Sequence, residues 1–284
     1  MMQQAFLPKD AIHIERPAAA EQRPLWRLYD QAYEVSPACT RETSVEAFAL
    51  RYQVYCLEKG FEDPAVNPLG LECDAFDGRS LHCLLRHRET GIPVGTARLI
   101  RPNPLKLGAS WPIQQICRDP RLFDEDLLPA ASTAEVSRFC LSTAARARIQ
   151  AACRRSADTD ETEGRLAPYT ILGLIRGLLM LSLEQGITHW TLVVEPALLR
   201  LLGRMGMQFT KLGPIVEYHG RRQPCCTEIA ALLQGMRAKR RDLWNIVTDR
   251  GSLSPETATD SAGVGGFWRD LAGGPAATRG VALA

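Results

Sequence analysis

The sequence contains no CxxC pair, no strong excess of either charge and no hydrophobic run of membrane length. Its nine cysteines are scattered, which argues against a zinc cage and fits a reducing, cytoplasmic compartment. The formal net charge of +2 on 284 residues lacks the basic stripe that a nucleic-acid partner requires. We therefore predict neither a metal site nor a nucleic-acid partner.

Hydrophobic segments long enough for the membrane or for export are also absent. The most apolar segment, Tyr169–Leu183, is about 15 residues long and contains Arg176, whereas a membrane span needs about 20 residues. The N-terminal stretch MMQQAFLPKDAIHIERP holds no apolar run of signal length. These features predict a cytoplasmic protein without a transmembrane segment.

Composition divides the chain into three parts. Residues 1–25 are polar and aperiodic, which predicts a flexible arm. Residues 26–234 alternate between strand and helix patterns and form the expected domain. Residues 235–284 are rich in Gly, Ala, Ser and Thr, which predicts a mostly flexible tail.

Hydrophobic periodicity predicts the elements of the central domain. The expected helices cover 44–58, 170–184 and 195–205, and the expected strands cover 81–86, 93–100, 133–142, 188–194, 208–218 and 225–233. Thr43 or Ser44 is the expected cap of the first helix. An antiparallel start followed by strand–helix–strand alternation predicts an α/β sheet with helices on its faces.

Charged residues interrupt several of these apolar elements. They are Arg51, Asp74, Asp77, Arg98, Glu135 and Arg138. One reading is an ion network that only fixes the fold, and the other is a polar pocket built from element ends. Glu135 and Arg138 lie on one expected strand three positions apart. They therefore point to opposite faces unless the strand bulges between them.

Four motifs follow one another in the chain: RYQVYCLEKGFEDP, GLECDAFDGRSLHCLL, VGTARLIRP and EVSRFCLS. In this order and at these intervals they resemble the acyl-homoserine-lactone synthases and the N-acyl amino acid synthases of the GNAT acyltransferase superfamily. The resemblance covers about residues 30–234. It is strongest to the acyltransferases associated with PEP-CTERM (exosortase) systems. It implies a mixed, mostly antiparallel central sheet, flanked by helices and splayed after the SRF strand to admit the acyl donor.

The resemblance also assigns residues to an amino-substrate pocket. They are Arg51, Tyr55, Phe61, Asp74, Asp77, Arg98, Glu135 and Arg138. The lactone synthases usually have Trp where this chain has Phe61, and Phe where it has Tyr55. Both differences argue against S-adenosylmethionine, the amine donor of the lactone synthases.

Acyl transfer from a thioester to an amine needs a base, a donor for the developing oxyanion and close positioning. We expect Glu135 to be the base, and Asp74 or Asp77 to hold the ammonium. Arg98 and Arg51 suit a substrate carboxylate. Backbone amides at Phe139, Cys140 and Leu141 would stabilise the oxyanion if the strand opens there. A covalent acyl-enzyme using Cys140 and His82 is a weaker alternative, because the sequence supplies no orienting third group.

The sequence favours an acyl carrier protein as the donor. Most GNAT enzymes hold coenzyme A in a glycine-rich loop, and the segment after Leu141 shows no such loop. It carries basic residues instead, which would suit an acidic carrier protein: Arg146, Arg148, Arg154 and Arg155. A solvated loop with ordinary charge is the alternative reading, and acyl-coenzyme A is the less favoured donor.

Together these observations predict an N-acyltransferase that joins a long acyl chain, delivered by acyl carrier protein, to the α-amine of an amino acid. Three alternatives stay open at this point. They are a lactone synthase that uses S-adenosylmethionine, a non-catalytic acyl-group sensor and a coenzyme A-dependent acetyltransferase of small amines. No bound cofactor is expected.

Overall fold

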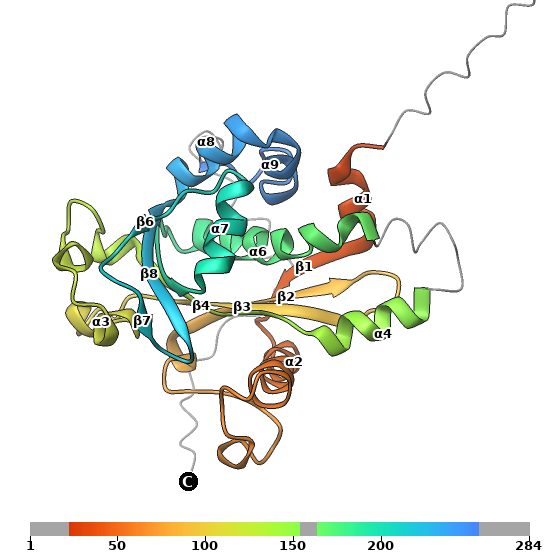
Figure 1. The fold of residues 1–284 in the computed structure, drawn as a ribbon, viewed down its shortest axis with the longest axis horizontal. Helices are drawn as coiled ribbons and strands as arrows, with labels where there is room; N and C mark the ends of the chain where they lie inside the picture. The colour runs from red at the N-terminus through yellow and green to blue at the C-terminus, as the bar shows by residue number, and fades with distance from the viewer. Residues whose placement is uncertain (1–22, 154–163, 256–284) are drawn as a thin grey trace, which may run out of the picture.

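The computed structural model describes residues 23–153 and 164–255, and its centre is an open eight-stranded sheet with helices on both faces (Figure 1). The strands are β1 (Tyr33–Pro37), β2 (Ser80–His87), β3 (Pro93–Ile100), β4 (Thr133–Leu141), β5 (His189–Val194), β6 (Thr210–Lys211), β7 (Val216–Glu217) and β8 (Arg221–Glu228). Their order is β1-β2-β3-β4-β5-β8-β6, and β7 pairs with β8. Among the strand pairs formed by the described residues, only β4–β5 is parallel. The predicted fold class is confirmed.

Helices cover the two faces of this sheet unequally. The α-helices are α1 (Leu25–Ala32), α2 (Arg41–Tyr52), α3 (Ile113–Ile116), α4 (Thr143–Cys153), α6 (Ile171–Glu184), α7 (Pro196–Arg204), α8 (Ile229–Lys239) and α9 (Arg241–Val247). In Figure 1, α1, α6, α8 and α9 lie on one side of the sheet and α2 on the other. Helix α6 packs so closely on β2 that a Cβ added at Gly177 would lie 2.6 Å from the sulfur of Cys83. It is buried almost all round, as its apolar sequence predicts.

The first long helix begins earlier than its sequence pattern predicts. Thr40 is its cap: the Thr40 side chain accepts a hydrogen bond from the Thr43 backbone N–H, and the Thr43 side chain accepts one from the Thr40 backbone N–H. This reciprocal cap serves more donors than Thr43 or Ser44 alone would, and it replaces the predicted one. After Tyr52 the helix continues as a π-helical segment over Gln53–Glu58.

The C-terminal part of the predicted domain differs most from its sequence pattern. The strand expected over 208–218 is reduced to the two-residue strands β6 and β7, because the Gly213-Pro214 turn interrupts it. The strand expected over 225–233 ends at Glu228, where α8 begins.

The predicted flexible tail begins at residue 235, but helical structure continues past this point. Helix α9 buries Leu243, Trp244, Ile246 and Val247 in the main hydrophobic core. The overall composition of 235–284 hides this helix, because its apolar residues are concentrated in one short segment. The domain therefore extends beyond residue 234, through α9. Residues 1–22 of the predicted arm and 256–284 of the predicted tail lie outside the described residues.

Strands β4 and β5 separate halfway along their length. They pair from Thr133 to Val136 with His189 to Leu192. Beyond these pairs β4 stays with β3 as far as Leu141, and β5 stays with β8 as far as Val194. The sheet therefore opens after Val136, close to where the family resemblance implies. Within 23–153 and 164–255, no helix is long and apolar enough to cross a membrane.

Candidate active site

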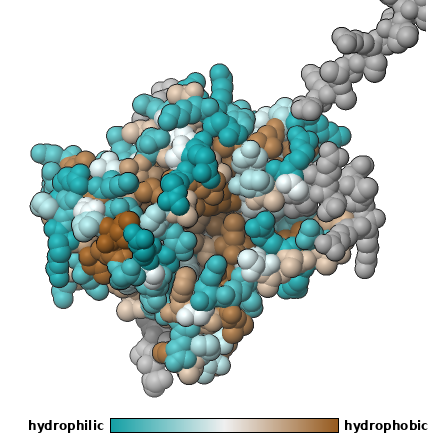
Figure 2. Space-filling model, viewed as in Figure 1, coloured by the Kyte–Doolittle hydropathy of each residue, from teal (hydrophilic) through white to brown (hydrophobic). Residues whose placement is uncertain are grey.

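A cavity of about 330 Å³ occupies the opening between β4 and β5. One part of its wall is apolar and includes Ile175, Leu178, Leu198, Leu202, Phe209 and Leu232. Another part is charged and includes Glu62, Asp74, Arg98, Glu135, Arg138 and Arg222. Figure 2 shows apolar surface within a hollow at the centre of one face of the molecule. A site of this kind can hold a molecule that is apolar at one end and charged at the other.

A bulge in β4 brings Glu135 and Arg138 to the same cavity. Ser137 pairs with Arg98 and Cys140 pairs with Thr96, so Arg138 and Phe139 together face the single residue Ala97. Arg138 adopts a positive φ of 45°, which is rare for a residue with a side chain. From the sequence, Glu135 and Arg138 could share one site only if β4 bulges between them, and this bulge is present.

Arg138 is held by carboxylates from the segment before β2. Its Nη2 lies 2.9 Å from Glu72 Oε1 and 3.2 Å from both Glu62 Oε1 and Asp74 Oδ2. Its guanidinium lies 5.3 Å from the ring centroid of Tyr55. These contacts offset the strain of the left-handed backbone at this position.

Arg51 and Arg98 form the rest of the charged cluster. Arg51 donates through Nε to Glu72 Oε2 at 2.5 Å, and through Nη1 and Nη2 to Asp77 at 2.7 and 3.1 Å. Arg98 donates through Nη1 to Asp74 at 2.6 Å and to Asp77 at 2.8 Å. The Nε of Arg98 donates to the Ser137 hydroxyl. We call Arg51, Arg98, Arg138, Glu72, Asp74 and Asp77 the arginine cluster.

Pairing keeps the carboxylates of this cluster ionised. Burial alone would raise the pKa of Asp77, but the contacts with Arg51 and Arg98 outweigh it and hold the pKa well below its usual range. Burial likewise opposes ionisation of Glu72, and the contacts with Arg51 and Arg138 lower its pKa. The cluster is therefore charged at neutral pH, with each buried charge matched by an opposite one.

Glu135 lies at the cavity wall in a different environment. It is buried, and its Oε2 accepts a hydrogen bond from the Ile113 backbone N–H at 2.9 Å. No ion pair joins Glu135 to an arginine or lysine of the described residues. Burial raises its pKa to about 8, against smaller opposing effects from the Ile113 amide and Arg98. A carboxyl group with this pKa can take up or release a proton near neutral pH.

The sequence-predicted residues occupy two layers. Those that line the cavity are Tyr55, Phe61, Asp74, Arg98, Glu135, Arg138, Phe139, Cys140 and Leu141. Arg51 and Asp77 do not line it. They lie behind Arg98, and the side chain of Arg51 is completely buried.

Sequence reasoning missed several residues of the site. Glu72 bridges Arg51 and Arg138, and its signal was available, since it stands two positions before Asp74 in GLECDAFD. Tyr218, His219 and Arg222 come from the β7–β8 hairpin and line the cavity mouth. Nothing in the local sequence connects this hairpin with the distant motifs.

Cys140 and His82 do not form a nucleophilic pair. Burial raises the pKa of the Cys140 thiol to about 12, so the thiol stays protonated at neutral pH and is a poor nucleophile. Burial and the nearby Arg51 lower the pKa of His82 to about 4. The His82 ring packs edge-on against Phe48, and its Nε2 lies 3.6 Å from Asp77.

The helix after β4 is fixed at its start. Glu58 accepts hydrogen bonds from the Ser142 hydroxyl at 2.6 Å and from the Thr143 and Ala144 backbone N–H groups at 2.9 and 3.2 Å. Arg146 and Arg148 follow on α4 and are exposed. The other two basic residues predicted to meet a carrier protein, Arg154 and Arg155, lie outside the described residues.

Comparisons with known proteins bear on the domain and on the fold. Residues 50–154 match the family described as the acetyltransferase (GNAT) domain. No curated protein sequence matches the chain significantly.

Several solved structures match the chain at low sequence identity. The structure of TofI in a ternary complex with an inhibitor and MTA has a TM-score of 0.51 and 18% identity, covering 72% of this chain and 96% of that one. The acyl-homoserine-lactone synthase LasI has a TM-score of 0.50 and 18% identity, with coverages of 73% and 95%. FeeM, an N-acyl amino acid synthase from uncultured soil microbes, has a TM-score of 0.45 and 13% identity, with coverages of 74% and 99%.

The chain therefore resembles a GNAT acetyltransferase domain over residues 50–154 and shares its fold with TofI and LasI. The predicted resemblance is confirmed at the level of this domain match and of the fold.

Proposed function

We propose that the protein is an acyltransferase that moves a long acyl chain from a carrier-protein thioester to the α-amine of an amino acid. The observation that carries the proposal is the shape of the cavity, in which the apolar wall and Glu135 belong to one space. The apolar wall suits a fatty chain, and the charged wall suits a small zwitterion. The reaction joins them where the sheet opens.

Glu135 is the proposed base. An ammonium has no lone pair for attack on a carbonyl, so the amine must first lose a proton. A base works best when its pKa lies near the operating pH, and the raised pKa of Glu135, about 8, meets this condition. The hydrogen bond from Ile113 fixes one carboxyl oxygen, and the cavity gives the amine access to the side chain.

The ammonium can be held by carboxylates on the charged part of the wall, which also carries Lys59, Arg98, Arg138 and Arg222. The arginine cluster together with Glu62 holds three arginines and four carboxylates, which leaves an excess of one negative charge. Asp74 and Glu62 are the members of this set that line the cavity and carry negative charge. They are the proposed ammonium-binding residues.

The substrate carboxylate needs a different partner from the two expected. All three nitrogens of Arg51 already donate to Glu72 and Asp77. Arg98 is engaged through Nε and Nη1, so it has no pair of unused nitrogens for bidentate binding. We assign the carboxylate to Arg222 at the cavity mouth.

Arg222 is suited to this role by its position and its contacts. It lines the cavity, lies 5.6 Å from the ring centroid of Phe61 and pairs through Nη1 with Glu195 at 3.0 Å. Within the described chain, its Nε and Nη2 make no hydrogen bond. A guanidinium with these two nitrogens unused can bind a carboxylate bidentately.

The opening of β4 supports a place for the oxyanion. Because Arg138 and Phe139 share one partner residue on β3, the ladder is interrupted at these two positions. An amide at Phe139 or Cys140 is then the proposed donor to the thioester oxygen. The leaving thiolate takes a proton, and the amide bond forms between the acyl carbon and the amine nitrogen.

One assay tests the proposal. The purified protein is incubated with long-chain acyl carrier protein thioester and either a mixture of amino acids or S-adenosylmethionine, and products are identified by mass spectrometry. N-acyl amino acids are expected. Lactone products would replace the proposal with a lactone synthase, and preferential use of acyl-coenzyme A would replace the donor.

Two variants assign the roles in the same assay. Glu135→Gln should lower kcat/KM by about 10²–10⁴ with the fold retained, as loss of a general base does. Arg222→Ala should raise KM for the amino acid with a much smaller change in kcat, because it removes a binding contact. Unchanged acylation by Glu135→Gln would exclude Glu135 as the base, and absence of any acylation by the wild-type protein would favour a non-catalytic acyl-group sensor.

A further inference from the structure

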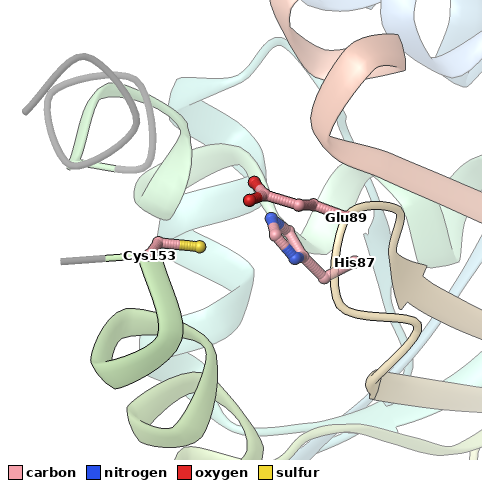
Figure 3. Close-up of side chains that lie close together, drawn as sticks. All are labelled: His87, Glu89 and Cys153. Carbon is pink, nitrogen blue, oxygen red and sulfur yellow. The ribbon is translucent and has the colours of Figure 1, made fainter. Parts of the chain in front are cut away.

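A second group of side chains with chemical potential lies away from the cavity. His87, Glu89 and Cys153 each offer a ligand atom, and these atoms all lie within 4.8 Å of one another. Figure 3 shows the Cys153 thiol and the Glu89 carboxylate directed toward the His87 ring. We propose that these three residues form a zinc-binding site that ties the end of α4 to the β2–β3 turn.

The three ligand types match zinc. Imidazole nitrogen, thiolate sulfur and carboxylate oxygen are its usual protein ligands, and three of them with one water complete a four-coordinate site. Zinc–ligand bonds of about 2.0–2.3 Å require the three atoms to approach by about 1 Å. Glu89 is exposed and its side chain can make this movement. His87 and Cys153 are 2% and 4% exposed, so packing already fixes the positions of these two side chains.

The imidazole is oriented by its neighbours. His87 Nδ1 lies 3.0 Å from the Thr90 hydroxyl, which also accepts a hydrogen bond from the Ile92 backbone N–H. If Nδ1 donates to this oxygen, Nε2 carries the lone pair that a metal requires. Histidine ligands in metal sites are commonly fixed in this way through their second nitrogen.

Charge balance also favours a divalent cation. A thiolate and a carboxylate contribute two negative charges, and a zinc ion with a neutral imidazole makes the site neutral. Burying Cys153 as a thiolate without a cation would be costly. The site was hidden from sequence reasoning because Cys153 is far along the chain from the adjacent pair His87 and Glu89, and no CxxC spacing marks it.

The consequence concerns α4, which follows the acyl-donor strand. Glu58 fixes the start of this helix, and the metal would fix its end. The inference does not depend on the identity of the acyl donor or the amine.

Cobalt is the probe for the test, because a bound thiolate gives Co²⁺ an intense near-ultraviolet charge-transfer band. Tag-free, full-length protein is treated with chelator, dialysed and titrated with Co²⁺ and then Zn²⁺. We expect one Co²⁺ per chain with the thiolate band, displacement by Zn²⁺, and a higher Tm for the zinc-loaded protein. Absence of the band in the wild-type protein would overturn the proposal.

Variants identify the ligands. Cys153→Ser should abolish the band, whereas Cys73→Ser, at an exposed cysteine outside the group, should leave it unchanged. Glu89→Gln should weaken metal affinity by about tenfold or more. A band that persists in Cys153→Ser would refute the site. If that variant does not fold, the exposed Glu89 decides: unchanged affinity in Glu89→Gln also refutes it.

Discussion

The arginine cluster and the cavity wall at Glu135 handle buried carboxylates in opposite ways. In the cluster, Asp77 and Glu72 each contact two arginines, and their pKa values are lowered. At the wall, Glu135 has one backbone amide as its partner, and burial raises its pKa to about 8. We propose that this difference separates two tasks: the paired carboxylates hold the fold in shape, and Glu135, which forms no ion pair with an arginine of the described residues, exchanges a proton.

The largest expected effect comes from removing a member of the cluster. Arg51→Met leaves Asp77 and Glu72 buried with one cation fewer, which should cost about 3–5 kcal/mol in the free energy of unfolding. A fall of roughly 10 °C in Tm would correspond to this loss. The measurement is chemical or thermal unfolding followed by circular dichroism.

Its control is Arg88→Ala. Arg88 pairs with Glu34 at 3.0 Å, but both side chains are about half exposed. Exposed pairs contribute only about 0–1 kcal/mol. Equal losses in the two variants would contradict the view that the cluster is a structural unit.

The second prediction separates the two carboxyl environments by pH. The pKa of Glu135 is raised to about 8, so the folded state holds a proton that the unfolded state releases above about pH 4.3. Stability should therefore fall as pH rises between about 4.5 and 8, with a contribution of at most about 1.4 kcal/mol per pH unit. Glu135→Gln should remove this slope in urea unfolding measured across the range.

The cluster supplies the contrast in the same experiment. The pKa values of Asp77 and Glu72 are lowered, so their contribution is present above about pH 4.5 and is lost as pH falls further. This acid limb should be the same in wild type and Glu135→Gln. A neutral-range slope that survives the substitution would assign it to another group.

The smallest expected effect concerns the cap of α4. Glu58→Gln keeps one acceptor oxygen and loses the other, which should cost about 1 kcal/mol near pH 7. The hydrogen bonds from Ser142 and Thr143, against the effect of burial, lower the pKa of Glu58 to about 2. The difference from wild type should therefore shrink as pH falls from about 5 toward 2, and a constant difference would point to packing instead of charge.

Sequence reasoning predicted the centre of this molecule better than its margins. Arg51, Asp74, Arg98, Glu135 and Arg138 stand on or beside long elements, and their strand or helix positions are readable from periodicity. The condition for Glu135 and Arg138 to meet was also readable, and the structure supplies the bulge.

The margins depend on contacts that local patterns do not encode. Arg222 lines the cavity because the two-residue strand β7 pairs with the start of β8 to form a hairpin. Helix α9 was hidden in a stretch of low average hydrophobicity, and its burial depends on α1 and α6 lying nearby. The sequence predicted Asp77 as a neighbour of Arg51 but not Glu72. It therefore could not show that all three nitrogens of Arg51 are already hydrogen-bonded.

The bulge at Arg138 has a further consequence, because it changes the parity of β4. Up to Ser137, the odd-numbered residues share a face with Arg98 and Ile100, whereas beyond the bulge Cys140 takes that face opposite Thr96. Before the bulge, the odd-numbered residues of β4 lie on the face of Arg98, and after it the even-numbered residues lie on that face. Deleting a single residue at this point would exchange every later side chain of β4 between the two faces, and should lower stability more than most replacements of any one residue there.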